Sequence, residues 1–259
     1  MDWTQIPAGK LHAAEQRLRV ALGDEASNVV ERINADTSFA DLVAGKIIIM
    51  VQEIADKQSS SLNPQWLRSR EIMAKNFFGV EEVIRCFGVS PSRVQLAVLS
   101  EIPFSESTLE QSKDTHVLAA VFPLSILDIR SNVQDKGLFY SQDWYDKQAF
   151  AKECGEVSWQ LVRKTPVDNS TSKNWQEQQA LLSKDDEVPT SQVMVYTIIG
   201  HYLATGERLF EHIYVRTSSV DSGGHRVDVG GFDSGGLLVR SCWGDRRSSD
   251  LGVSSARKF

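Results

Sequence analysis

The side chains of this sequence that could act as nucleophiles or metal ligands are few and scattered. The cysteines, Cys86, Cys154 and Cys242, are odd in number and lack the spacing of a zinc site, which fits a reducing compartment without a disulfide framework. Four of the five histidines, His116, His201, His212 and His225, show no ligand spacing either. The stretch GGFDSGG neither matches a phosphate-binding loop nor opens a helix, and no nucleophile elbow occurs. We therefore expect no enzymatic activity, no cofactor and no metal.

The last forty residues, 220–259, differ from the rest of the chain. Eight of the seventeen glycines fall between residues 223 and 252. Apolar and polar residues alternate around them, as where Val227 and Val229 flank Asp228. A period of two places one set of side chains inward and the other outward, so the pattern predicts short strands joined by tight turns. A plain solvated strand face would carry Lys and Glu, and this one does not.

Five residue types are nearly missing from this part of the chain. Between His212 and Arg257, Trp243 is the only Lys, Glu, Gln, Met or Trp residue. These five types share one property, since none can be reached from an asparagine codon by changing its two adenines. A turn region rich in Gly, Ser and Asp would also be poor in Lys and Glu, and that simpler interpretation stays open.

The stretch VGGFDSGGLLVRSCWGDRRSSDLGVSSARKF resembles the C-terminal variable region of target proteins of diversity-generating retroelements. Its glycine-rich strand pair, Trp243, the Asp-containing loop 245–250 and the closing Leu251-Gly252-Val253 carry the resemblance. Those proteins are similar in fold to C-type lectins, and adenine-directed mutagenesis rewrites their surface residues. The resemblance implies an α+β fold with a C-type lectin-like domain over 116–259, its variable region at about 217–259, and a helical region before it.

The resemblance further implies non-catalytic binding of a ligand, which we expect to be a protein, through outward residues of the last strands and loops. The predicted binding residues are Ser222, His225, Asp228, Gly231, Asp233, Gly235, Leu238, Arg240, Ser241, Cys242, Gly244, Arg246, Arg247, Ser249 and Asp250. The predicted buried scaffold consists of Val227, Val229, Leu237, Val239, Trp243, Leu251 and Val253. The identity of the ligand and the oligomeric state do not follow from the sequence.

Two related families suggest other sites. Calcium-dependent lectins carry a Trp-Asn-Asp motif and a Pro-containing loop, whereas here Trp243-Gly244-Asp245 has Gly in place of Asn, so we expect no calcium. Formylglycine-generating enzymes have a similar fold and use paired cysteines, whereas Cys242 stands alone. An oxidase of that type is the alternative function, and it would need a second sulfur or a metal beside Cys242.

The preceding residues predict helices and a few strands. Residues 1–75 have apolar residues at helical spacing, and residues 76–115 predict a helical hairpin with apolar stripes in both helices. That hairpin also has the outline of a helix-turn-helix DNA-binding regulator, but Arg93 is the only base of its second helix. Further on, the patterns predict a strand-like segment at 116–130, which Pro123 places at a sheet edge or splits, and a strand at 159–163. They also predict an amphipathic helix from Trp144 that ends near residues 154–155, a helix capped by Asn174 and a strong helix at 193–203.

Composition sets wider limits on function. The 259 residues carry a net charge of −6, which disfavours a nucleic-acid or membrane-surface partner. The N-terminus lacks the apolar stretch of a secretory signal, and the longest strongly apolar run, 47–51, is far too short to span a membrane. We therefore expect a soluble protein that is cytoplasmic by default, with export by a route other than the general secretory pathway left open.

Overall fold

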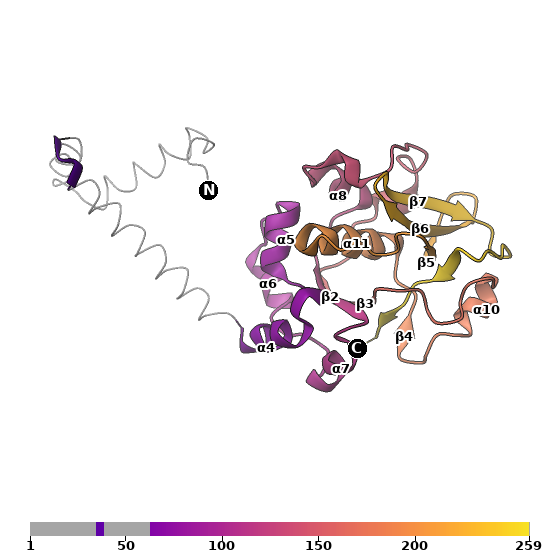
Figure 1. Ribbon diagram of the computed structural model, residues 1–259, viewed down its shortest axis with the longest axis horizontal. Helices are drawn as coiled ribbons and strands as arrows, with labels where there is room; N and C mark the ends of the chain where they lie inside the picture. Colours follow the sequence, from indigo (N-terminus) through magenta and orange to yellow (C-terminus); the bar gives the residue numbers. More distant parts are fainter. Residues whose placement is uncertain (1–34, 39–62, 259) are drawn as a thin grey trace. The chain divides into compact units, whose positions relative to one another are not determined.

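The computed structural model describes residues 35–38 and 63–258. The chain divides into two units, Met1–Leu62 and Asn63–Phe259. The helices expected at 1–62 therefore lie almost entirely outside the described residues. The second unit includes both the expected helical hairpin and the whole of 116–259 (Figure 1), so the compact unit begins at Asn63 rather than at residue 76 or 116.

The second unit is an α+β structure. Its first part contains α4 (Pro64–Met73), the 3₁₀ helix η3 (Ala74–Asn76), β1 (Phe77–Phe78), α5 (Val80–Phe87), α6 (Arg93–Val98) and α7 (Glu106–Ser112). Its middle contains β2 (His116–Val121), α8 (Ile126–Asn132), the 3₁₀ helix η4 (Lys136–Leu138), α9 (Ala149–Lys152), β3 (Ser158–Arg163), α10 (Trp175–Gln179), β4 (Asp186–Glu187) and α11 (Ser191–Thr205). It ends with β5 (Tyr214–Val220), β6 (Arg226–Asp233), β7 (Gly236–Cys242), β8 (Leu251–Val253) and β9 (Ala256–Arg257).

The strands form two sheets that share α11 as their common core helix. One sheet has the order β1-β2-β3-β9-β4 and the other has the order β7-β6-β5-β8. α11 contacts strands of both sheets, and Figure 1 shows it between them. Its apolar side chains are buried in the same core cluster as the inward-facing residues of β2, β3, β6 and β7. The hydroxyl of Tyr196 in α11 donates to Ala120 O of β2 at 2.9 Å, which satisfies a polar group inside this core.

Several predicted elements are confirmed. The strong helix expected at 193–203 is α11, which ends at Gly206 in the left-handed conformation. The strand expected at 159–163 is β3, and Asn174 caps α10 by accepting from the backbone N–H of Glu177. The hairpin expected at 76–115 begins with α5 and α6, joined through a left-handed Gly88.

Other expectations need correction. The strand-like segment expected over 116–130 ends at Val121, just before Pro123, and its second half is helical because Ser125 and Asp128 form a capping box that starts α8. The helix expected from Trp144 to about residue 154 is only the short α9. The apolar stripe expected in the second helix of the hairpin is mostly exposed, since α6 has no buried residue and Val94 is 74% exposed, while Leu99 after it is buried.

Among the described residues, no helix has the length and apolar character that crossing a membrane requires.

Candidate functional site

The predicted binding residues lie at two opposite ends of the β6–β7 hairpin and on the strands between them. The β5–β6 turn, residues 221–225, meets the end of β7 and the following loop 243–249, since Arg226 pairs with Cys242. The β6–β7 turn, residues 233–236, lies at the far end of the same two strands. The structure therefore divides the predicted set into two surfaces rather than one continuous face.

We call the first of these the Trp243 surface. It consists of the turn 221–225, Arg226, the loop 243–249 and the residues of α10 that contact them. The backbone of loop 243–249 is bound to the neighbouring loop and helix, because Trp175 N donates to Gly244 O at 2.7 Å and Ser172 N donates to Ser248 O at 2.8 Å. Six predicted binding residues belong to it: Ser222, His225, Gly244, Arg246, Arg247 and Ser249.

The carboxylate of Asp221 organises the turn of the Trp243 surface. Its Oδ1 accepts from the backbone N–H groups of Gly223 and His225 at 2.8 and 2.9 Å, and its Oδ2 accepts from the Ser241 hydroxyl at 2.8 Å. His225 Nδ1 lies 2.9 Å from the same Oδ2. Burial alone would raise the pKa of Asp221, but these hydrogen bonds outweigh it and hold the pKa below its ordinary value. The turn is therefore fixed by an ionised carboxylate.

The Asp221 network also positions an aromatic pair. The ring of His225 stands edge-on to Trp243, with 4.0 Å between the ring centroids and 87° between the ring planes. Trp243 itself is 66% exposed. We expected this tryptophan in the buried scaffold, and that prediction is wrong, because β7 ends at Cys242 and the next side chain projects from the loop.

A row of charged residues crosses the outer face of the second sheet. Arg216 of β5, Asp228 of β6 and Arg240 of β7 are partners in register, and Arg240 Nε lies 2.9 Å from Asp228 Oδ1. Arg216 is fully buried and Asp228 is 1% exposed. The guanidinium of Arg240 lies 3.2 Å from the centre of the Tyr214 ring. This face is therefore covered over much of its area. Contrary to our expectation, Asp228 is not available to a ligand.

Arg216 fixes the loop that covers this face. Its two terminal nitrogens donate to four oxygen atoms at 2.7 to 3.2 Å. Three are the backbone carbonyl oxygens of Lys173, Trp243 and Arg246, and the fourth is the side-chain Oε1 of Gln178. A buried guanidinium needs such compensation because removing it from water is costly. One residue of β5 thus holds the backbone of the Trp243 surface in place.

The remaining predictions about burial have mixed outcomes. The scaffold residues other than Trp243 are buried as expected: Val227, Val229, Leu237, Val239, Leu251 and Val253. Of the predicted binding residues, Ser222, Asp233, Gly235, Arg246, Arg247 and Ser249 are exposed, and His225, Leu238, Arg240, Ser241, Gly244 and Asp250 are half-buried. Asp228, Gly231 and Cys242 are buried, contrary to expectation. Cys242 and Asp228 lie on the outer strand face, where Arg216 and its loop cover them.

Gly231 is fixed by the backbone as well as by burial. Its φ of +58° belongs to the left-handed region, and a Cβ added there would collide with the hydroxyl of Tyr214. At Gly244 the closest atom to an added Cβ is Trp175 Cβ at 3.6 Å, which is ordinary contact. Of these two predicted variable positions, the structure therefore leaves room for a side chain at Gly244 and not at Gly231.

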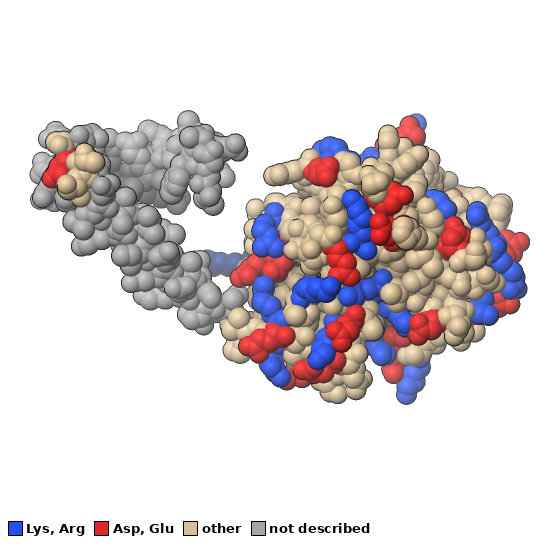
Figure 2. Space-filling model, in the orientation of Figure 1, with Lys and Arg blue, Asp and Glu red and all other residues tan. Residues whose placement is uncertain are grey.

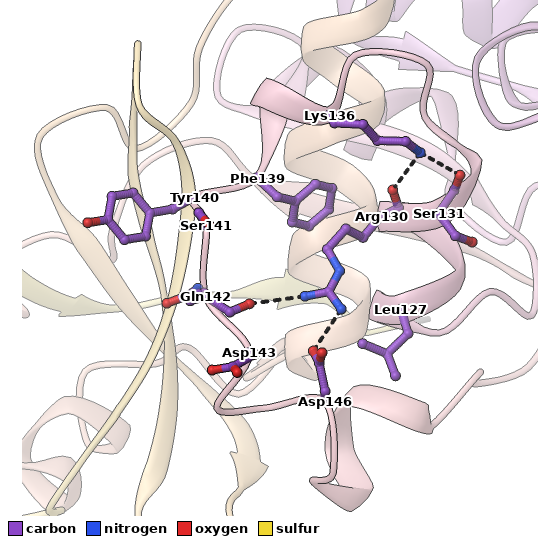
Figure 3. A pocket seen from close by; sticks show the side chains of 10 residues that line it. All are labelled: Leu127, Arg130, Ser131, Lys136, Phe139, Tyr140, Ser141, Gln142, Asp143 and Asp146. Atoms are coloured by element: carbon purple, nitrogen blue, oxygen red, sulfur yellow. Dashed lines mark hydrogen bonds and ion pairs between the residues drawn. The ribbon is translucent and has the colours of Figure 1, made fainter.

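The far end of the hairpin lies beside a hollow of about 870 Å³ (Figure 3). Phe139 pairs with Leu237 of β7, and Tyr140 N donates to Leu237 O at 3.1 Å, so the loop that lines the hollow runs along the edge of this strand. The lining residues are Leu127, Arg130, Ser131, Lys136, Phe139, Tyr140, Ser141, Gln142, Asp143 and Asp146.

The two cations of the hollow are already engaged. Arg130 donates to Gln142 O and, at 2.7 Å, to Asp146 Oδ1 (Figure 3), and it also donates to the Tyr145 hydroxyl. Lys136 donates to three carbonyl oxygens at the end of α8 and just beyond it, those of residues 130, 131 and 133. These contacts brace the loop against α8, and they leave neither cation free to hold an anionic ligand.

The geometry of the cysteine and serine side chains does not favour nucleophilic catalysis. Burial raises the pKa of the Cys242 thiol, and the nearby charge of Asp228 adds to this effect, so the thiol is protonated at neutral pH. Ser241 and His225 both bind the carboxylate of Asp221, whereas a catalytic serine must bind the histidine. Within the described part of the chain, no group of three or more His, Cys, Asp or Glu residues is placed to hold a metal ion.

Sequence reasoning missed four residues of this region: Asp221, Arg216, Arg226 and Trp175. The Asp-Ser-Gly-Gly sequence at 221–224 is a turn signal that could have identified Asp221 as an acceptor for its own backbone. Arg216 and Trp175 carry no such local signal, because their partners lie 27 or more positions away in the chain.

Comparison with known proteins identifies no relative, since no protein-family model, curated protein or solved structure matches this chain.

Proposed function

We propose that this chain is a non-catalytic display protein that binds another protein, with a C-type lectin-like fold whose exposed C-terminal residues are diversified by a retroelement. The observation that carries the proposal is which residue types are exposed in the C-terminal region. Fourteen exposed residues lie between His212 and Arg257, and none of them is Lys, Glu or Gln. Those three types make up much of an ordinary protein surface. An adenine-directed process that starts from asparagine codons cannot produce them.

The arrangement of elements supports the fold assignment. Strand β2, helices α8 and α9 and strand β3 follow one another, then α10 and α11 precede the terminal strands β5 to β8. The buried residues of β6 and β7 pack into the core beneath the exposed turns, so loop residues can change without removing apolar contacts. Such a framework suits recognition, because binding residues on loops are held by rigid strands.

The surface chemistry supports a protein ligand over a nucleic acid. On the face that Figure 2 shows, acidic and basic residues are interspersed rather than segregated. At the Trp243 surface, Arg247 forms a two-point ion pair with Glu177, with Nη1–Oε2 and Nη2–Oε1 distances of 2.7 and 2.8 Å. A DNA-binding surface needs a continuous positive field. Exposed tryptophan and arginine beside serine and glycine are typical of protein-binding loops.

Two alternatives can be weighed against this proposal. The oxidase of the formylglycine-generating type needs a reactive thiolate, and the burial of Cys242 works against it. The helix-turn-helix regulator needs a basic second helix, whereas α6 exposes Val94, Leu96 and Val98 beside Arg93. If the protein does not bind duplex DNA at any salt concentration, including low salt, the regulator is excluded.

The test of diversification is the DNA beside the gene. We expect a near-copy of the 3′ coding end, differing mainly at adenines, next to a reverse-transcriptase gene. The substituted codons should include those of Ser222, Arg246, Arg247 and Ser249, and should exclude that of Val229. A complete genome without such a copy would refute the proposal.

Binding can be tested independently with two libraries of equal size in the full-length protein. One library varies Ser222, Asp245, Arg246, Arg247 and Ser249, and the control library varies the exposed residues of the loop 134–147, which lies outside the variable region. Both are displayed and selected against a single purified protein, hen egg lysozyme. We expect binders from the first library. An equal yield of binders from the control would show that the variable loops are not specialised for recognition.

A further inference from the structure

Helix α6 leaves its own apolar side chains uncovered. None of its six residues is buried, and Val94, Leu96 and Val98 are 74%, 37% and 54% exposed. Single apolar residues are ordinary on a protein surface, whereas three within five consecutive positions form a patch of the kind that marks interaction sites. A short helix gains most of its stability by packing an apolar face. The patch on α6 therefore needs a partner to explain it.

Contacts at both ends hold α6 in place. At its start, Ser92 N donates to Gln95 Oε1 at 2.8 Å and Gln95 N donates to Ser92 Oγ at 3.3 Å, which is a capping box. Just after its end, Leu99 is buried, and its carbonyl oxygen accepts from the indole N–H groups of Trp66 and Trp159, each at 2.9 Å. A helix that is fixed before association loses little conformational entropy when a partner covers it.

The charges that border the patch complement each other. Between Gly88 and Ser105 the only charged residues are Arg93 and Glu101. Arg93 is the first residue of α6, and Glu101 follows the end of the helix. Both are exposed, and neither has an ion-pair partner within the described residues. Because the cation and the anion lie at opposite ends, two such segments that run antiparallel bring opposite charges together.

We propose that α6 is the contact between two copies of this chain, which pack their α6 helices antiparallel around a two-fold axis. Val94, Ala97 and Val98 have the spacing that places side chains on one face of a helix, and this face would form the centre of the contact. Arg93 of each copy would then lie near Glu101 of the other, since a two-fold axis repeats every contact. The proposal does not depend on the recognition function proposed above.

A second copy fits this patch better than a nucleic acid or an unrelated protein. A nucleic acid would find a single cation, Arg93, among uncharged residues. An unrelated protein would have to supply both an apolar face and a matching pair of charges, whereas a second copy already carries both. Because a stable interface commonly buries about 800 Å² on each partner, and a six-residue helix supplies only part of such an area, we expect a reversible dimer.

The position of α6 is compatible with the other surface of the protein. Figure 1 shows α6 on the opposite side of the unit from α10 and the terminal strands, which carry the Trp243 surface. Pairing through α6 therefore leaves both Trp243 surfaces uncovered. If these surfaces bind a ligand, the dimer displays two of them and gains avidity towards a target with repeated sites.

The first test measures the molar mass of the full-length protein by sedimentation equilibrium at concentrations from about 1 to 300 μM. We expect a monomer–dimer equilibrium. Val94→Glu should weaken dimerisation more than about 30-fold, because it places an unpaired charge in the contact. Thermal unfolding of the monomer should not change, since Val94 is 74% exposed. The matched control is Leu181→Glu, an exposed apolar position beyond α10, which should leave the dimer unchanged.

The second test exchanges the charges. Arg93→Glu and Glu101→Arg each turn both ion pairs of the dimer into contacts between like charges, so each variant alone should dimerise about 10-fold more weakly. An equimolar mixture of these two variants should dimerise as well as the unaltered protein, because opposite charges meet again at both contacts. The double variant Arg93→Glu/Glu101→Arg should recover in the same way.

Three results would overturn the proposal. The full-length protein could stay monomeric over the whole range of concentrations. It could form a dimer that Val94→Glu leaves intact, which would place the contact elsewhere on the molecule. It could form a dimer that the mixture of charge variants does not restore, which would exclude the antiparallel pairing. The recognition function is tested separately, by the neighbouring DNA and by the two libraries.

Discussion

Arg216 shows how a single buried side chain can support a surface that it does not reach. Its guanidinium holds Gln178 Oε1 and three backbone carbonyls, two of which belong to the loop of the Trp243 surface. Asp228 lies beside it in register and is equally buried. Removing the cation would leave several buried acceptors, and the carboxylate nearby, without compensation.

We therefore predict that Arg216→Met lowers the free energy of unfolding by about 3–5 kcal/mol, as measured by chemical denaturation. Amide hydrogen exchange of residues 243–249 should accelerate in this variant. The control is Arg246→Met, an exposed position where we expect a change within about 0.5 kcal/mol. Equal effects of the two substitutions would show that the Arg216 contacts do not stabilise the loop.

His116 makes the fold sensitive to moderate acid. Burial, and secondarily the charges of Arg257 and Arg163, lower its pKa from 6.5 to about 4. The unfolded chain therefore binds a proton in this range that the folded chain does not, so stability present at pH 7 is lost as the pH falls towards 4. The expected loss is about 3 kcal/mol, at about 1.4 kcal/mol for each pKa unit.

His116→Gln should flatten the pH dependence of stability between pH 6.5 and 4, measured by urea denaturation at a series of pH values. It should not remove the dependence, because burial also lowers the pKa of His201. His212→Gln is the control, since the His212 side chain is 87% exposed. An unchanged slope in His116→Gln would contradict the assignment.

At the scale of elements, the β6–β7 hairpin separates glycines that the fold requires from glycines that it tolerates. Gly236 has a φ of +97°, and a Cβ added there would lie 2.6 Å from the backbone of Phe139 and of Tyr140. Gly244 has neither restriction. The glycines of this region are thus not interchangeable, although the composition alone makes them look alike, and the proposed diversification could act at Gly244 but not at Gly236.

We predict that Gly236→Ser destabilises the protein by more than about 2 kcal/mol, because it combines an unfavourable φ with a clash against backbone. Gly244→Ser should change the stability by less than about 0.5 kcal/mol. Thermal unfolding of the two variants measures both effects. A tolerated serine at 236 would mean that the adjoining loop can move away from the strand.

The elements that the sequence predicts well are those that local signals specify. α11 combines an apolar run with the N-cap Thr190 and the left-handed Gly206, so its existence follows from neighbours in the chain. The burial of Asp228 does not follow in this way, because it depends on Arg216 and on the loop that Arg216 holds. Trp243 misled for a related reason, since alternation continues past Cys242 in the sequence while the strand ends there.

At the scale of the whole molecule, all the described contacts that position the Trp243 surface lie within the compact unit Asn63–Phe259. We predict that residues 63–259 expressed alone unfold cooperatively, with a midpoint within about 4 °C of the full chain, which corresponds to about 1 kcal/mol or less. Circular dichroism on heating provides the measurement. A fragment that melts without a cooperative transition would show that residues 1–62 are needed for this fold.

The placement of β9 has one more consequence. Ala256 and Arg257 pair with both β3 and β4, so the residues that follow β5 to β8 in the chain join two strands of the first sheet, whereas β5 to β8 form the second. Neither sheet can be completed until the segment 214–257 has been synthesised and has found its place. If this segment is diversified as we propose, each variant that fails to complete the two sheets stays partly unfolded and open to proteases before it meets any target.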